Sequence, residues 1–249
     1  MKKTWVFLLL ACFVLLGASA CTNNENKQIL AEINSGMDAF SEVENGFIKF
    51  NITSLALDSE QGKTKESAEL LFRKDDNRFE YIMKIDQNTN DVFIIKLIDG
   101  KMTQYLQSEK EEKSAEFSED FVIEKKTVKD KNSMLVIMKM FISNKPNNKY
   151  IESIKTIKDD ELTGYKLNSN NKFLEEYNQK MPKCVDKAVN AYDELQLSET
   201  VYWLNDEGLL VKLNQHTLKT TKYLGTETVY DIAMECELIN YNKNEFEKI

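Results

Sequence analysis

The sequence predicts an α+β protein built on one large antiparallel sheet. Most of the chain alternates apolar and polar residues with a period of two, which is typical of half-buried strands, while three segments show helical spacing instead. The chain contains only 8 Gly and 2 Pro, and no linker rich in Pro, Gly or Ser interrupts it. We therefore expect residues 28–249 to form a single domain.

The first 20 residues have the pattern of a secretory signal peptide. Lys2 and Lys3 precede an uncharged run, Thr4–Ala20, that ends in small residues. The run is shorter than the roughly 20 apolar residues that a membrane-spanning helix prefers. We therefore expect residues 1–20 to be removed as a signal peptide rather than kept as an anchor helix.

Ala18-Ser19-Ala20-Cys21 resembles a bacterial lipobox, although Leu is usual where Ala18 stands. The resemblance implies that the Cys21 thiol takes a diacylglycerol, so that the protein is held by lipid on the extracytoplasmic face of the cell membrane. Residues 21–27 would then be a polar tether. Cleavage by ordinary signal peptidase, which leaves Cys21 unmodified, is the alternative.

The first half of the domain reads as a helix followed by a meander. Apolar residues at three- and four-residue spacing predict a helix over Lys27–Val43. From Gly46 the period changes to two, and strands are expected around residues 48–53, 67–73, 79–85, 92–98 and 102–106. Asp99-Gly100 is a hairpin signal between the last two strands.

The second half mixes helices and strands. A helix from Met134 to about Ser143 is apolar nearly all round, so we expect it to be buried on most sides. Another helical segment, Asn171–Tyr192, is broken near Pro182. Five strands are expected at Tyr150–Lys158, Leu162–Leu167, Thr200–Leu204, Leu209–Gln215 and Thr228–Asn240.

Charge and motifs exclude several classes of function. The net charge of −8 argues against a nucleic-acid partner, which normally meets a basic surface. His216 is the only histidine and is expected at the end of a strand, and the motifs of zinc sites and of serine hydrolases are absent from the mature sequence. We expect no metal, no cofactor and no enzymatic activity.

Two cysteines remain in the domain, Cys184 and Cys236. An even pair in an exported protein is compatible with a disulfide. Both cysteines lie in apolar patterns, so two buried free thiols are an equal alternative.

The arrangement resembles the LolA/LppX-type lipoproteins. The resemblance rests on the lipobox, the first helix, the meander, and the segment Val201–Leu213, which is similar to a late hairpin of that family; Asp99-Gly100 followed by Tyr105 is similar to an earlier hairpin. It implies an unclosed half-barrel, a single curved antiparallel sheet with helices packed on its concave face. In that family the enclosed apolar cavity holds acyl chains.

The resemblance implies a surface lipoprotein that binds a lipid or another hydrophobic ligand. The candidate ligand-binding residues share an apolar character and are Phe50, Phe72, Tyr81, Met83, Met134, Met138, Phe141, Ile232 and Met234. Met134, Met138 and Phe141 would form a movable lid, since Met adapts to irregular ligands. The same residues could instead form an ordinary core. In that case the protein would be a non-enzymatic envelope sensor or assembly module that contacts another envelope protein.

Overall fold

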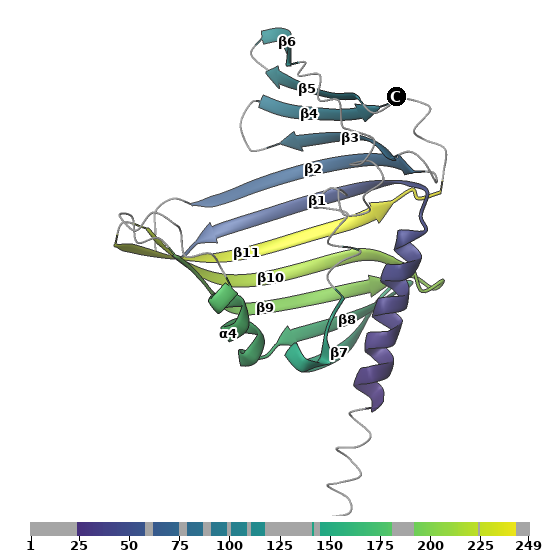
Figure 1. Cartoon of the computed structure of the whole chain (residues 1–249), viewed down its shortest axis with the longest axis vertical. Helices are drawn as coiled ribbons and strands as arrows, with labels where there is room; N and C mark the ends of the chain where they lie inside the picture. Colours follow the sequence, from purple (N-terminus) through teal and green to yellow (C-terminus); the bar gives the residue numbers. More distant parts are fainter. Residues whose placement is uncertain are drawn as a thin grey trace, which may run out of the picture.

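The computed structural model describes residues 24–57, 62–74, 79–86, 91–98, 101–108, 111–117, 141, 145–180, 192–223 and 225–242. Eleven strands form one antiparallel sheet in the order β6-β5-β4-β3-β2-β1-β11-β10-β9-β8-β7 (Figure 1). Among these residues no pairing joins the edge strands β6 and β7, so the sheet is an unclosed half-barrel.

The strands follow one another along the chain with a single exception. They are β1 Asn45–Ala56, β2 Lys63–Lys74, β3 Phe79–Asp86, β4 Asp91–Ile98, β5 Lys101–Ser108, β6 Glu111–Phe117, β7 Ile151–Asp159, β8 Leu162–Ser169, β9 Tyr192–Leu204, β10 Leu210–Tyr223 and β11 Thr226–Ile239. The exception is the pairing of β1 with β11, which places the first and last strands side by side in the middle of the sheet.

One face of the sheet, called the inner face below, packs against the helix of residues 24–41 (Figure 1). Ile48 of β1 lies in register with Leu70 of β2 and Leu238 of β11, so their side chains share this face. Met37 and Phe40 of the helix lie in the same buried cluster. The helix forms because its apolar residues recur at three- and four-residue spacing, which puts them on one side.

The helix approaches the β9–β10 hairpin closely because Gly36 has no side chain. A Cβ at this position would lie 2.6 Å from Cδ2 of Leu204 and 2.8 Å from the carbonyl oxygen of Gly208. The hairpin tip is itself fixed, since Oδ1 of Asn205 accepts from the backbone N–H of Leu209 at 2.9 Å. Gly208 adopts φ +78°, a conformation that favours glycine. Helix and hairpin therefore define one end of the inner face.

Two shorter helices, η2 (Asn148–Tyr150) and α4 (Asn171–Lys180), lie near the β7–β9 edge of the sheet. Asn170 caps α4 by accepting from the N–H of Phe173 at 3.0 Å. Strand β8 pairs only with residues 199–204 of β9, so the first half of β9 extends beyond it. There the Asn178 amide donates to the carbonyl of Leu195 at 3.0 Å and accepts from its N–H at 2.7 Å. This amide replaces a neighbouring strand and protects an exposed edge.

The structure confirms the predicted fold class and corrects several boundaries. The first helix spans residues 24–41, so it begins inside the segment expected to be a tether. Strand β6 was not predicted, and β10 continues to Tyr223 instead of ending at Gln215. Strand β9 begins at Tyr192, where a helix was expected to end, and α4 stops at Lys180. These stretches carry polar residues on both faces, so the alternation that marks a strand is missing.

The signal peptide, Cys21 and Cys184 lie outside the described residues, as does all of the expected helix Met134–Ser143 except Phe141. In the part of the chain that the structure describes, no helix is both long enough and apolar enough to cross a membrane.

Candidate functional site

Six of the nine candidate ligand-binding side chains share the inner face. Residues that are paired directly in an antiparallel sheet point to the same side. The pairs Phe50–Cys236, Ile52–Met234 and Ser54–Ile232 join β1 to β11. On the other side of β1, Phe72 of β2 pairs with Tyr81 of β3, and Leu70 pairs with Met83. The register thus brings Phe50, Phe72, Tyr81, Met83, Ile232 and Met234 to one surface.

A seventh candidate, Phe141, packs directly against the first helix. Its ring stacks on that of Phe40 with centroids 4.5 Å apart and planes 14° apart. Both side chains are completely buried. Phe141 therefore belongs to the core at the helix end of the inner face. Met134 and Met138, the other residues of the expected lid, lie outside the described residues.

The inner-face candidates divide into buried and partly exposed residues. Phe72, Tyr81 and Met83 are buried in the main apolar cluster, which includes the helix. Phe50 and Met234 pack against this cluster but keep partial exposure, as does Ile232 beyond them. We use the name apolar stripe for the partly exposed apolar residues of this face, Phe50, Ile52, Ile85, Ile95, Ile232 and Met234. The stripe continues the core across strands β4, β3, β1 and β11.

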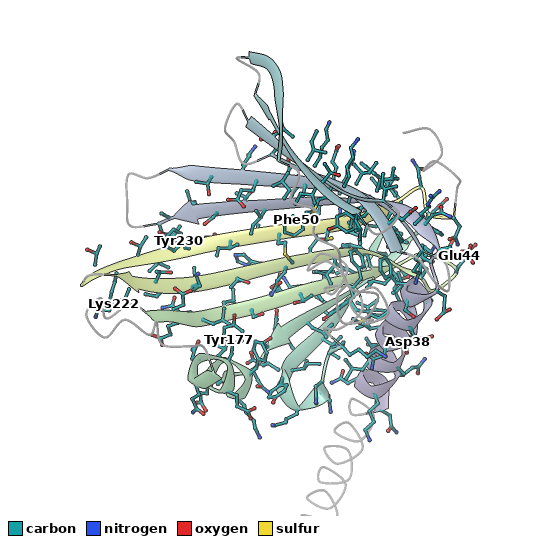
Figure 2. The ribbon with its side chains drawn as sticks, turned by 45° about the horizontal axis from the view of Figure 1, so that its top comes forward. Asp38, Glu44, Phe50, Tyr177, Lys222 and Tyr230 are labelled. Carbon is teal, nitrogen blue, oxygen red and sulfur yellow. The ribbon has the colours of Figure 1, made fainter. Side chains whose placement is uncertain are left out.

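The stripe gives way to polar residues at the end away from the helix. Figure 2 shows the distance between the two ends, with Glu44 on one side, Phe50 in the middle, and Tyr230 and Lys222 at the opposite tip. On β9 and β10 the inner-face positions beyond the stripe include the paired residues Ser198 and Thr217. A ligand on this surface would meet apolar groups next to hydrogen-bonding groups.

An ion pair organises the polar end. Nζ of Lys219 lies 3.0 Å from Oδ2 of Asp193, and the Thr221 hydroxyl donates to Oδ1 at 2.8 Å. Burial acts to raise the pKa of the Asp193 carboxyl, but the hydrogen bonds from Lys219 and Thr221 outweigh it and lower that pKa. Asp193 is therefore held as a carboxylate.

Two tyrosines and a cysteine belong to the buried core in their neutral forms. Burial and a hydrogen bond to Glu32 of the first helix raise the pKa of Tyr165 to about 12, and burial raises the pKa of Tyr202 as well. Burial, followed by the nearby charge of Glu235, raises the pKa of the Cys236 thiol to about 12. Cys236 is a buried free thiol, and Cys184, its possible disulfide partner, lies outside the described residues.

The described residues offer no arrangement for metal chemistry, because none of their His, Cys, Asp and Glu side chains cluster in groups that could hold a metal ion. His216 does not lie at a strand end as expected. It lies in the middle of β10 on the outer face, with Nε2 2.7 Å from Oδ1 of Asp231. The sequence could not place it because polar residues continue on both sides of this position.

Comparisons with known proteins find no related sequence and only distant matches among solved structures. No protein-family model matches the chain, and no curated protein matches it. A DUF1329 family protein from Desulfovibrio piger is 9% identical with a TM-score of 0.29, and the match covers 88% of this chain and 93% of that one. A LolA superfamily protein from Nitrosomonas europaea is 11% identical with a TM-score of 0.25, covering 86% and 93%.

A third solved structure, described as an outer membrane lipoprotein-sorting protein domain from Vibrio parahaemolyticus, is 12% identical with a TM-score of 0.25, covering 86% and 92%. At such TM-scores these three matches carry no argument about function, which has to rest on the residues themselves.

Proposed function

We propose that this chain is an exported lipoprotein, attached to the membrane through Cys21, that binds a lipid or another hydrophobic ligand on the inner face of its sheet. The apolar stripe carries the proposal. Four of its side chains, those of Phe50, Ile85, Ile95 and Met234, pack against a fully buried core, and all six keep partial exposure in the described structure. Apolar surface left at the edge of a core is typical of a binding site.

The chemistry of the stripe suits an amphipathic ligand. Burial of apolar surface contributes roughly 25 cal/mol per Å², so each ~100 Å² covered by an acyl chain would contribute about 2.5 kcal/mol. Met234 has a flexible thioether that can adapt to ligands of different shape. The hydroxyl and charged groups beyond Ile232 would face the polar part of such a ligand.

Lipid content and lipid uptake test the proposal. The domain from Thr22 onward, purified without detergent, should show co-purified lipid in native mass spectrometry and should take up a fluorescent fatty acid. Ile52→Glu places a charge in the stripe and should abolish uptake. Leu55→Glu is the matched control on the same strand, because Leu55 is 38% exposed and faces the other side of the sheet.

A domain that carries no lipid and takes up no fatty acid would contradict the proposal. So would equal uptake by the Ile52→Glu and Leu55→Glu variants. The anchor is tested separately, since Cys21→Ser should remove the mass of the acyl groups and release the protein from membranes.

A further inference from the structure

The outer face of the sheet contains a concavity that the proposed function does not use. It has a volume of about 280 Å³ and lies across four adjacent strands, β1, β11, β10 and β9. The residues that line it are Asn51, Thr53, Glu199, Val201, Asn214, Gln215, His216, Ala233, Met234 and Glu235. By register, all of these except Gln215 and the stripe residue Met234 have outer-face side chains. Ala233 pairs with both Thr53 and His216, so a small side chain stands between two larger ones and leaves a hollow.

The polar groups on one side of this concavity are held in place by a chain of contacts. Nε1 of Trp203 donates to Oδ1 of Asn214 at 2.7 Å, and Nδ2 of Asn214 donates to Oε2 of Glu235 at 3.2 Å. Nζ of Lys212 lies 3.2 Å from Oε1 of Glu235. The amide orientation of Asn214 is therefore fixed before any ligand arrives, which reduces the entropy lost on binding.

The carboxylates that line the concavity are matched pair by pair. Oε2 of Glu199 lies 2.7 Å from Nζ of Lys166. With Lys212 beside Glu235, each carboxylate of the lining has a basic partner. The lining therefore presents hydrogen-bonding atoms with little unbalanced charge, which disfavours a strongly charged ligand of either sign.

Two lining side chains remain available for a ligand. Neither the Asn51 amide nor the Thr53 hydroxyl forms a hydrogen bond to any residue that the structure describes. An amide offers two donors and an acceptor, and a hydroxyl offers one donor and two acceptors. Together with the lone pairs of Glu199 and Glu235, they form a mixed rim of donors and acceptors over a floor that includes Val201 and Ala233.

We propose that this outer-face concavity binds a neutral polyhydroxylated ligand of about the size of one sugar ring. Hydroxyl groups both donate and accept, so they can satisfy carboxylate, amide and threonine groups at the same time, while the C–H surface of the ring would cover Ala233 and Val201. Apart from Gln215 and Met234, the lining side chains lie on the face opposite the apolar stripe, so a ligand in the concavity does not cover the stripe.

His216 provides a direct measurement, because it is the only histidine of the chain. The domain from Thr22 onward, labelled with ¹⁵N histidine, is titrated with glucose, N-acetylglucosamine and glycerol. Saturable shifts of the ring signals with either sugar, and weaker ones with glycerol, are expected. A larger effect of glycerol than of both sugars would overturn the assignment to a ring-sized ligand.

Three variants locate the binding. Ala233→Leu fills the hollow from an exposed position and should remove the saturable shift. Asn51→Ala should weaken binding about three- to tenfold, as expected for one hydrogen bond. Thr226→Leu, an exposed position at the start of β11 and outside the lining, is the matched control and should bind as the parent does.

Absence of any shift with the three probes would overturn the proposal. A shift that persists unchanged in Ala233→Leu would also overturn it, because binding would then lie elsewhere. Fatty-acid uptake by the same samples reports on the inner face separately, so a failure here is distinguishable from a failure of the proposed function.

Discussion

The two ends of the inner face are built from different residues on the same strands. Near the first helix, β1 and β11 contribute Ile48 and Leu238, which are buried against Met37 and Phe40. Toward the other end, the same two strands pair Ser54 with Ile232, and both keep partial exposure. The difference teaches that the helix stabilises one end of a sheet that is long enough to leave the other end for binding.

The largest expected effect is at the helix end. Phe40→Ala removes a buried ring and its stacking on Phe141, and should lower the free energy of unfolding by about 3–5 kcal/mol. Ile232→Ala should lower it by about 1 kcal/mol, because its side chain already touches solvent. Urea unfolding of the domain from Thr22 onward measures both. Equal losses would mean that the two ends are not energetically distinct.

The close contact between helix and hairpin should be the next most sensitive feature. Gly36→Ala improves the helix propensity by about 1 kcal/mol. The added Cβ would nevertheless collide with Leu204 and with the Gly208 carbonyl, and overpacking typically costs about 1–3 kcal/mol. We expect net destabilisation in thermal unfolding. Ser35→Ala, on the exposed side of the same helix, is the control and should be neutral; a stabilised Gly36→Ala variant would show that the contact is loose.

A smaller effect is expected where α4 protects β9. Asn178→Ala removes both hydrogen bonds to the backbone of Leu195 and should lower stability by about 1 kcal/mol. Hydrogen exchange at the Leu195 amide should become faster, while exchange at the helix end stays unchanged. Gln179→Ala, an exposed neighbour, should leave the Leu195 amide protected. Unchanged exchange in Asn178→Ala would refute the role assigned to this amide.

The smallest expected effect is the loss of stability at low pH that comes from Asp193 at the polar end of the inner face. A carboxyl whose pKa is lowered on folding stabilises the fold above its ordinary pKa of 3.8, and this stabilisation is lost as the pH falls through the lower, folded pKa. NMR titration should therefore place the Asp193 pKa below 3.8. In Lys219→Met the pKa should rise, because the ion pair is gone while burial remains. If the Asp193 pKa does not rise in Lys219→Met, the ion pair with Lys219 is not the cause of its lowered pKa.

The sequence predicts the apolar parts of the fold far better than the polar parts. The alternation of Ile48, Phe50 and Ile52 marks β1 correctly because one side of that strand is apolar. The second half of β10, with Thr217, Lys219 and Thr221 on its inner side, gives no such signal, so its length could not be predicted.

The candidate site was predictable only as a shared face. Alternation put Phe72 and Phe50 on the same side, but their difference in burial depends on where the first helix ends over the sheet, which no local pattern encodes. The outer-face concavity gave no signal at all. Asn51 and Ala233 come from opposite ends of the chain, and only the β1–β11 register brings them together.

The β1–β11 pairing also has a consequence for how the molecule is made. Phe50 of β1 pairs with Cys236 of β11, which is 186 residues later in the chain, so the β11 side of β1 stays unpaired until β11 has been made. Contacts so distant in sequence slow folding. A chain synthesised from its N-terminus would therefore expose an unpaired, aggregation-prone edge of β1 until β11 is available. Because β11 lies between β1 and β10, its loss would divide the sheet into two separate sheets, whereas loss of an edge strand would only shorten the sheet.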